Sequence, residues 1–461
     1  MQLEIRDKAT RELIGELPVA SREEANRAVA RAREAFSAWR EVPVVERARL
    51  LFRYADALER RREDLALCVS RENGKILSDA RAEVRRGIEA VEFACGMPSL
   101  MMGDSLPDIA RGIDSISVRY PLGVCVGITP FNFPAMIPLW MFPIAIAAGN
   151  TFVLKPSPQT PLTSELLAAS AQECAFPEGI LNVVHGANET AEALIEHPDV
   201  AAVSFVGSSQ AARLVQARGV AHHKRVQALG GAKNFIVVMP DAVDAFTRDA
   251  VIGAAFGGAG QRCLAGSVVV AVGDAGDSLV PMLVDAAEKL RIGCGADEGV
   301  EMGPVVSDDA IARIDGYVQR ARESGAALLL DARPVPGTGS FAAPIIFDRV
   351  DPESELAREE IFGPVLSIVR VDTLEEAIRV ANRSRYGNAS SIFTHDGGSA
   401  RRFASRIEVG MVGVNVGIAA PMAFFPFGGV KDSIFGDLRC HGKDAVAFYT
   451  QQRVTISRWP S

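Results

Sequence analysis

The chain has 461 residues, of which 48% are hydrophobic and 23% are charged, a composition typical of a soluble globular protein with a large core. At about 100–200 residues per domain, this length predicts two to four domains. The 49 basic and 57 acidic side chains give a net charge of −8, and no long block carries one sign. These features argue against nucleic acid or an anionic membrane as a partner.

The cysteines indicate a reducing compartment. Their number is odd, seven, and none of them forms a C-x-x-C pair. We therefore expect free thiols and a cytoplasmic location. Charged residues begin at the fourth position, so we also expect no secretory signal.

One uncharged stretch, 121–154, is long enough on paper to span a bilayer. Prolines and asparagines interrupt it repeatedly, and such residues break a membrane-spanning helix: Pro130, Asn132, Pro134, Pro138, Pro143 and Asn150. A buried strand–loop–helix–strand unit explains the stretch better. We expect no membrane partner.

The N-terminal part of the chain predicts helices. Ser21 followed by Glu24 is a capping-box pattern, and apolar residues follow it at helical spacing. Further helices are expected over 47–67 and 79–95, the second with one apolar face. The chain starts close to its first helix, so we expect no strand before it.

From residue 122 onward, short apolar runs alternate with helical segments. Strands are expected at 122–129, 151–155, 180–184 and 202–207, with helices at 137–148, 162–174 and 190–196 between and after them. This order predicts a parallel sheet covered on both faces, the architecture that binds dinucleotides at its carboxyl edge. A second α/β series follows Leu229, with strands at 235–239 and 267–272, and helices ending at 256 and covering 279–290 and 309–324.

The predicted fold is therefore α/β, with two interleaved Rossmann-like domains and a small β-extension. We assign 1–102 and 121–228 to a dinucleotide-binding domain and 229–438 to a catalytic domain. The segments 103–120 and 439–461 are expected to form oligomerisation strands, because a hairpin and a tail at 454–459 have the pattern of edge strands that need a partner. A homo-oligomer, either a dimer or a tetramer, is expected.

Cys263 is the first candidate for chemistry. It ends the heptapeptide Gly-Gly-Ala-Gly-Gln-Arg-Cys, in which small residues allow a ligand to approach the backbone closely. The adjacent cation, Arg262, favours the thiolate, which is the nucleophilic form of cysteine. The heptapeptide alone leaves a buried structural cysteine equally open.

Polar or small residues follow several predicted strands. Asn132 could stabilise an oxyanion through its amide, and Lys155 is placed for a ribose or a phosphate. Gly207 and Ser208 come where a strand meets a helix start, which suits a pyrophosphate. A turn, a snorkelling lysine and a helix cap are the structural alternatives, and the usual G-x-G-x-x-G is absent.

These motifs, with EEIFGPVL (359–366) and PFGGVKDS (426–433), resemble the aldehyde dehydrogenase superfamily over essentially the whole chain and in the family's order. The resemblance implies Cys263 as the nucleophile and Asn132 as part of the oxyanion hole. It implies contacts with a nicotinamide cofactor from a wider set of residues, and no metal site: Phe131, Lys155, Gly207, Ser208, Glu360 and Phe362.

One departure from the family concerns the second half of the reaction. Hydrolytic members share an E-L-G-G-K segment whose glutamate activates water, and here that position falls on Ala228 or Leu229. Neither side chain can accept a proton, and Glu360 is the nearby alternative base. Loss of the glutamate resembles the CoA-acylating branch that oxidises methylmalonate or malonate semialdehyde, and further stretches support this branch: 99–106, 224–234, 253–263, 413–429 and 442–450.

That branch implies coenzyme A as co-substrate and two arginines, Arg86 and Arg262, for the substrate carboxylate. From its position off the apolar face, Arg86 would otherwise be a solvated helix residue. The branch as a whole favours NAD. Pro158 stands where the family usually has an acidic residue near the adenosine ribose, and the absence of a carboxylate that would repel a 2′-phosphate removes one reason to exclude NADP. Candidate pocket side chains are Phe133, Trp140 and Phe425.

The expected activity is NAD-dependent oxidation of the semialdehyde through a cysteine thioester, with CO2 release and formation of propionyl-CoA or acetyl-CoA. A hydrolytic semialdehyde dehydrogenase that yields a free acid is the alternative within the same class. A protein that keeps the fold without catalysis is the alternative from another class, and Cys263, Asn132, Lys155 and Glu360 together argue against it.

Overall fold

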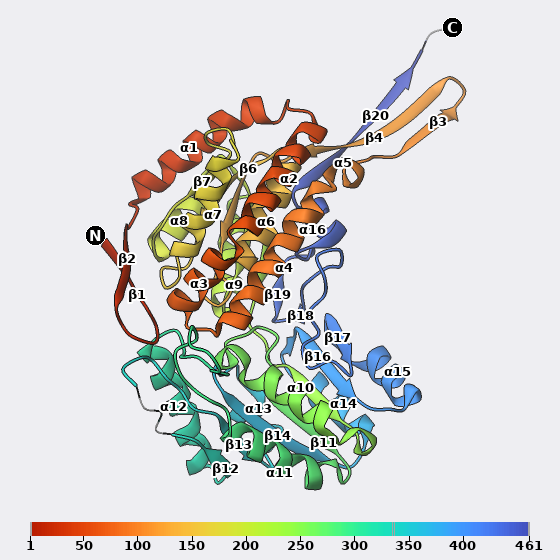
Figure 1. The fold of residues 1–461 in the computed structure, drawn as a ribbon. Helices are drawn as coiled ribbons and strands as arrows, with labels where there is room; N and C mark the ends of the chain where they lie inside the picture. The colour runs from red at the N-terminus through yellow and green to blue at the C-terminus, as the bar shows by residue number, and fades with distance from the viewer. Residues whose placement is uncertain (1, 334, 336, 460–461) are drawn as a thin grey trace.

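A computed structural model describes all residues except 1, 334, 336, 460 and 461 (Figure 1). Two large sheets, each flanked by helices, lie one above the other in this view, and a narrow β-extension projects from the upper half. The α/β prediction is confirmed. None of the helices in the described part of the chain is both long and apolar enough to cross a membrane.

The first sheet has six strands in the order β19-β9-β8-β5-β6-β7. All neighbouring pairs are parallel except β19 with β9. The strands are β5 (Val124–Ile128), β6 (Thr151–Lys155), β7 (Leu181–Val183), β8 (Val200–Val206), β9 (Arg225–Leu229) and β19 (Ile434–Phe435). The predicted order of parallel strands from 122 to 207 is confirmed.

Alternation along β5 divides the core of this half between two faces of the sheet. Cys125 joins the apolar cluster that contains Tyr54 and Phe142, whereas Val124 and Val126 join the cluster around α1 and α8. All five residues of β5 are buried, as expected for a parallel strand covered on both faces. The covering helices are α6 (Met136–Ala147), α7 (Leu162–Glu173), α8 (Asn188–Glu196), α9 (Ser209–Ala221) and those of the N-terminal segment.

The N-terminal helices are α1 (Arg22–Trp39), α2 (Val44–Arg60), α3 (Arg62–Asn73), α4 (Leu77–Cys95) and the short α5 (Met97–Leu100). The capping box is confirmed, because Ser21 N–H donates to the Glu24 carboxylate at 2.7 Å and Glu24 N–H donates to Ser21 Oγ at 3.2 Å. The single helix expected over 47–67 is wrong. The chain turns at Arg61 (φ −97°, ψ 10°), so that α2 packs on α4 and α6 while α3 packs on α4 and α7.

The expectation of no strand before the first helix is also wrong. β1 (Gln2–Arg6) and β2 (Leu13–Pro18) form an antiparallel hairpin. Asp7 starts its turn, since the carboxylate accepts the N–H groups of Ala9 and Thr10 at 2.9 and 3.1 Å. Burial of Ile5 anchors β1 to the rest of the molecule.

The second sheet has seven strands in the order β12-β13-β14-β11-β10-β16-β17, parallel except for β12. Its strands are β10 (Phe235–Val238), β11 (Val268–Val272), β12 (Ala327–Asp331), β13 (Ile345–Asp348), β14 (Val365–Val371), β16 (Ala389–Phe393) and β17 (Met411–Val414). The helices of this half are α10 (Ala245–Phe256), α11 (Ala275–Glu288), α12 (Asp308–Glu323), α13 (Glu355–Arg358), α14 (Leu374–Asn382) and α15 (Gly397–Arg406). Short 3-10 turns lie at Pro240–Ala242 and Gly257–Gly260, and β15 (Tyr386–Gly387) pairs with β18 (Val430–Lys431).

The extension contains β3 (Ser105–Ala110), β4 (Ile113–Pro121) and β20 (Thr450–Arg458), after the helix α16 (Gly442–Phe448). β4 is the central strand and pairs antiparallel with both neighbours, from Thr450↔Pro121 to Arg458↔Ile113 on the β20 side. The predicted hairpin and C-terminal strand are therefore present. β19 joins the first sheet although it lies within the segment predicted as catalytic, so the two halves exchange chain segments, and the domain boundaries stay a prediction.

Candidate active site

Three predicted cofactor motifs share one edge of the first sheet. β5 ends just before the loop with Phe131 and Asn132, β6 ends at Lys155, and β8 ends just before Gly207. Because β8, β5 and β6 are parallel neighbours, their carboxyl ends lie side by side. This is the edge at which doubly wound sheets bind nucleotides.

Gly207 and Ser208, the two residues after β8, fit the close approach of a phosphate group. A Cβ on Gly207 would lie 2.5 Å from the Phe205 ring, so the space there admits no side chain. Ser208 precedes α9, and its hydroxyl accepts the Ala211 N–H at 3.3 Å, so Ser208 does serve as the helix cap that was left open. Lys155 is buried, its ammonium donates to the Pro156 carbonyl at 3.1 Å, and burial lowers its pKa to about 8.

The loop before Cys263 is tightly coiled. Gly258, Ala259 and Gly260 all have left-handed backbones, with φ of 58°, 52° and 70°. A Cβ at Gly260 would lie 2.2 Å from the Gly363 carbonyl oxygen, which makes glycine obligatory there. The heptapeptide glycines thus shape the approach to the nucleophile.

Two asparagines that the sequence did not point out hold the end of this loop. The side-chain amides of Asn234 and Asn388 each donate to the Cys263 carbonyl at 2.9 Å. Asn234 lies at the start of β10 and Asn388 at the start of β16, so neighbouring strands of the second sheet fix the cysteine backbone.

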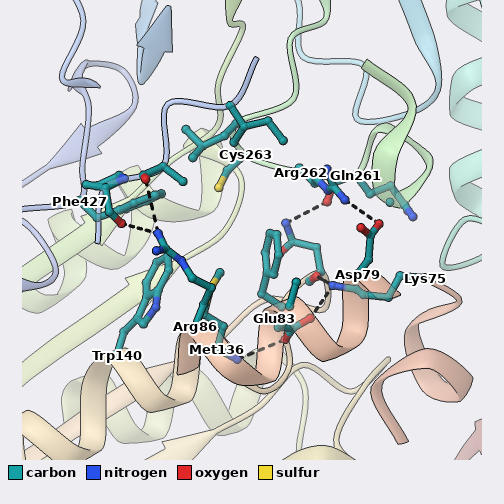
Figure 2. Close-up of a pocket in the computed structure, with 18 of the residues that line it drawn as sticks. Lys75, Asp79, Glu83, Arg86, Met136, Trp140, Gln261, Arg262, Cys263 and Phe427 are labelled. Atoms are coloured by element: carbon teal, nitrogen blue, oxygen red, sulfur yellow. Dashed lines mark hydrogen bonds and ion pairs between the residues drawn. The ribbon is translucent and has the colours of Figure 1, made fainter. Parts of the chain in front are cut away.

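A cavity of about 300 Å³ brings the chemical candidates together (Figure 2). It is lined by charged and polar side chains that include Lys75, Asp79, Glu83, Arg86, Asn132 and Cys263. Aromatic rings close it, namely Phe133, Trp140, Phe427 and His441. Phe425, a predicted pocket residue, lines a different hollow beside β17.

Asn132 is buried, and its side-chain amide donates to the Gln261 carbonyl at 3.0 Å. An amide NH2 has a second N–H bond, which can serve an oxyanion formed in the same cavity. Asn132 and Cys263 are thus placed together, as the oxyanion prediction requires.

The two arginines predicted to bind the substrate carboxylate differ in their contacts. Arg86 reaches from α4 into the cavity beside Trp140, and it donates to the Pro421 carbonyl at 2.7 Å and to Glu89 at 3.3 Å (Figure 2). The side chain is 31% exposed, so it is neither a solvated surface arginine nor sealed off. Arg262 also lines the cavity, but it is paired with Asp79 at 2.6 Å.

Arg262 favours the Cys263 thiolate, as expected from the sequence, but burial of the thiol outweighs it in the free protein. Burial raises the pKa of the Cys263 thiol to about 12, and the charge of Glu360 adds to this rise. The effect of Arg262 is in the lowering direction and is smaller. The Asp79 carboxylate, 2.6 Å from Arg262, carries the opposite charge and so opposes the field of the cation at Cys263.

This pKa predicts how Cys263 reacts with iodoacetamide. Below a pKa of about 12 the thiolate fraction rises with pH, so alkylation of the free protein should accelerate about tenfold per pH unit between about pH 7 and 9. The pseudo-first-order rate, followed by mass spectrometry of the Cys263 peptide, measures this slope. A rate that is constant over that range would show a thiolate already formed and contradict the prediction.

Glu360 lies outside the cavity lining and near the nucleophile loop. It accepts the Ala232 N–H at 2.8 Å, and its carboxylate lies against Gly231, where a Cβ would come within 2.3 Å of it and displace it. Burial raises the pKa of Glu360 to about 7. Phe362 packs edge-on against Phe131 with ring centroids 5.8 Å apart, which joins two predicted cofactor residues.

The position of the missing glutamate is apolar in the structure. Ala228 and Leu229 end β9, are buried, and pair with Phe435 and Ile434 of β19. Lys233, four positions further, is buried, and its ammonium has no hydrogen-bond partner among the described residues. Burial lowers the pKa of Lys233 to about 7.

Sequence reasoning missed Lys75, Asp79, Glu83 and His441 as cavity residues. Lys75 follows the end of α3, and the acidic residues Asp79 and Glu83 lie on α4. Charged residues at such positions ordinarily point to solvent. His441 has φ 70°, and its ring stands at 87° to Trp140 with centroids 4.3 Å apart. Burial and the charge of Arg86 lower the pKa of His441 to about 3, so its imidazole is neutral. The described residues hold no group of three or more His, Cys, Asp or Glu side chains that could bind a metal ion.

Two interleaved α/β halves place the carboxyl edge of a parallel sheet near a cavity that holds a cysteine and an amide. This arrangement is that of enzymes that pair a thiol with a dinucleotide-binding fold. The chain belongs to the aldehyde dehydrogenase family, whose model matches residues 1–455. It is 53% identical over 455 residues to malonate-semialdehyde dehydrogenase 2 of Geobacillus kaustophilus, covering 98% of this chain and 94% of that protein.

Solved structures agree in fold. Methylmalonate-semialdehyde dehydrogenase from Oceanimonas doudoroffii superposes with a TM-score of 0.98 at 44% identity, over 100% of this chain and 96% of that one. A candidate methylmalonate-semialdehyde dehydrogenase from Sinorhizobium meliloti, solved with NAD, also gives 0.98 at 44% identity, over 100% and 95%. The family resemblance drawn from the sequence is confirmed, as is the aldehyde dehydrogenase fold.

Proposed function

We propose that this protein oxidises malonate or methylmalonate semialdehyde with NAD. The observation that carries the proposal is a single cavity lined by a thiol, an amide donor and a guanidinium, contributed by Cys263, Asn132 and Arg86. The relatives named for these semialdehydes support the same substrate class. A small-molecule partner fits a cavity of about 300 Å³.

The residues at the strand ends fit the cofactor. Gly207 and Ser208 stand at the start of α9, where main-chain N–H groups suit a pyrophosphate, and Lys155 presents an ammonium at the end of β6. Phe131, Phe362 and Glu360 would hold the nicotinamide end. NAD, when bound, supplies the hydride acceptor. Pro158 places no carboxylate against a 2′-phosphate, so NADP stays a second possibility for this site.

In the first half of the reaction, the semialdehyde carboxylate binds Arg86, and the thiolate of Cys263 attacks the aldehyde carbon. The Asn132 amide and the Cys263 N–H stabilise the oxyanion. After loss of the hydride the acyl group remains on sulfur as a thioester. Arg262, which is paired with Asp79, attracts the carboxylate of the semialdehyde from a longer distance than Arg86 does.

In the second half, the malonyl-type thioester loses CO2, and a proton from solvent takes its place on the adjacent carbon. The acyl group then passes from Cys263 to the sulfur of coenzyme A. The product is acetyl-CoA or propionyl-CoA, and Cys263 regains its proton. The apolar ends of β9 support this acceptor, since no carboxylate occupies the position of the water-activating glutamate. A thiol as acceptor ionises without such a base more readily than water does.

Hydrolysis to a free acid is the second candidate, and one observation favours it. The pKa of Glu360 is raised to about 7, which is suited to a general base at neutral pH, and its charge is felt by Cys263. The two candidate functions differ in what accepts the acyl group from Cys263, which is coenzyme A in one and water in the other.

The deciding experiment follows NADH formation from malonate semialdehyde with and without coenzyme A, and identifies the product by mass spectrometry. The acylating proposal expects a single burst of NADH without coenzyme A and sustained turnover to acetyl-CoA with it. Sustained turnover to a free acid without coenzyme A would establish the hydrolytic alternative instead.

We also propose that the extension assembles two or more copies of the chain. β20 is an edge strand with Val454 and Ile456 60% and 66% exposed, a large apolar area for a free strand. Replacing both with aspartate should therefore shift the protein to monomers in light-scattering chromatography. Thr455→Asp, on the opposite face of β20, is the matched control and should leave the assembly unchanged. An oligomer that survives the double substitution would contradict the role of β20.

A further inference from the structure

One buried ion pair, Lys75 with Glu83, contacts the loop between β5 and α6 at Asn132 and at the start of α6. Figure 2 shows the pair beside Met136. Lys75 and Glu83 lie 2.5 Å apart, and their side chains are 6% and 1% exposed. Lys75 comes from the turn between α3 and α4, and Glu83 from α4 itself. Neither has a place in the proposed reaction.

Lys75 holds the middle of the loop. Its ammonium donates to the main-chain carbonyl of Asn132 at 2.6 Å and lies 4.3 Å from the centre of the Phe133 ring. A charged donor makes this hydrogen bond stronger than one between neutral groups. The backbone of Asn132 is thus fixed directly by Lys75.

Glu83 holds the end of the same loop, where α6 begins. One carboxylate oxygen accepts the N–H groups of Ala135 and Met136 at 2.8 and 3.2 Å, at the first turn of α6. The other oxygen receives Lys75. Each charge is therefore satisfied by its counter-ion and by main-chain groups of the same loop, which is what a buried pair needs to persist.

The side chain of Asn132 is held from the opposite direction. Its amide donates to the carbonyl of Gln261, two residues before Cys263. The loop consequently lies between the ion pair on one side and the nucleophile segment on the other. Movement of the Asn132 carbonyl away from Lys75 would shift the amide relative to Cys263.

We propose that Lys75 and Glu83 are positioning residues that set the Asn132 amide where the oxyanion forms. This inference rests on the proposed function, because it concerns the oxyanion donor of that reaction. The ion pair itself touches no reacting atom, and it acts through Asn132.

A double-mutant cycle tests the proposal. Lys75→Met alone would leave the Glu83 carboxylate without its counter-ion, so the neutral pair Lys75→Met/Glu83→Gln is used, in which glutamine can still accept the N–H groups of α6. The rate of the NADH burst should fall about tenfold, since small displacements of a catalytic group are costly. Added to Asn132→Ala, the same pair should produce no further loss.

Three controls separate positioning from damage to the fold. Arg81→Met/Glu63→Gln removes an exposed ion pair between α4 and α3, the two helices that flank Lys75, and should leave the burst rate unchanged. NAD affinity and the rate of Cys263 alkylation should match the native protein in the Lys75/Glu83 variant. Both measurements should be unchanged, because the proposal expects only the oxyanion step to slow.

An unchanged burst in Lys75→Met/Glu83→Gln would overturn the proposal, and so would a full tenfold loss on top of Asn132→Ala. Loss of NAD affinity together with the burst would overturn it as well, because that result indicates general unfolding. If Asn132→Ala itself left the burst intact, the oxyanion role in the proposed function would fail, which is a separate result.

Discussion

Replacing Cys263 with serine is expected to abolish the NADH burst and steady turnover. A serine hydroxyl in this cavity has no adjacent base to activate it, so the loss should be on the order of 10⁴-fold or more. Stopped-flow absorbance after mixing with NAD and semialdehyde measures the burst. NAD affinity should persist, because the strand-end residues that would hold the cofactor lie outside the cavity lining.

Cys294→Ser is the matched control, as Cys294 is also a half-buried free thiol but lies outside the cavity. Its activity should equal that of the native protein. A Cys263→Ser protein that still formed NADH at more than a small fraction of the native rate would rule out a covalent mechanism at this position.

Replacing Arg86 with methionine should lower kcat/KM for malonate semialdehyde about hundredfold. A charge-assisted pair with a carboxylate contributes about 1.5–3 kcal/mol, and methionine leaves the carboxylate unpaired in a partly closed cavity. Propanal has no carboxylate, so its kcat/KM should change by less than about threefold. Comparison of the two substrates isolates the charge contact from any general damage.

Arg85→Met is the control for this experiment. Arg85 is the preceding residue of α4, points away from the cavity and pairs with Glu59 and Glu92 at the surface. It should leave both substrates unaffected. Equal losses for propanal and the semialdehyde in Arg86→Met would show that Arg86 supports the cavity wall rather than the carboxylate.

The fold was largely predictable because its strongest signals are local. The Ser21 capping box and the apolar runs of β5, β6, β8 and β10 each specify an element within a few residues. The division of the second helix at Arg61 has no such mark, since the surrounding residues are good helix formers. It results from α2 and α3 packing in different directions.

The site was predictable only where a motif carries it. Cys263 and Asn132 stand in distinctive segments, and the structure places both in one cavity. Lys75, Asp79 and Glu83 read as ordinary surface charges in the sequence, and their place in the cavity depends on α4 lying beside α6 and the nucleophile loop. The pairing of Arg262 with Asp79 spans 183 positions, which no local pattern reports.

The interleaving of the two halves also sets an order of events during synthesis on the ribosome. The cavity walls come from residues between Asn73 and His441, and β9 receives its outer partner only from β19, at 434–435. Nearly the whole chain must therefore emerge before the last wall and the last strand can dock. Contacts this distant in sequence form slowly. A nascent chain that ends before residue 427 therefore lacks Phe427 and His441, two of the aromatic walls of the thiol pocket.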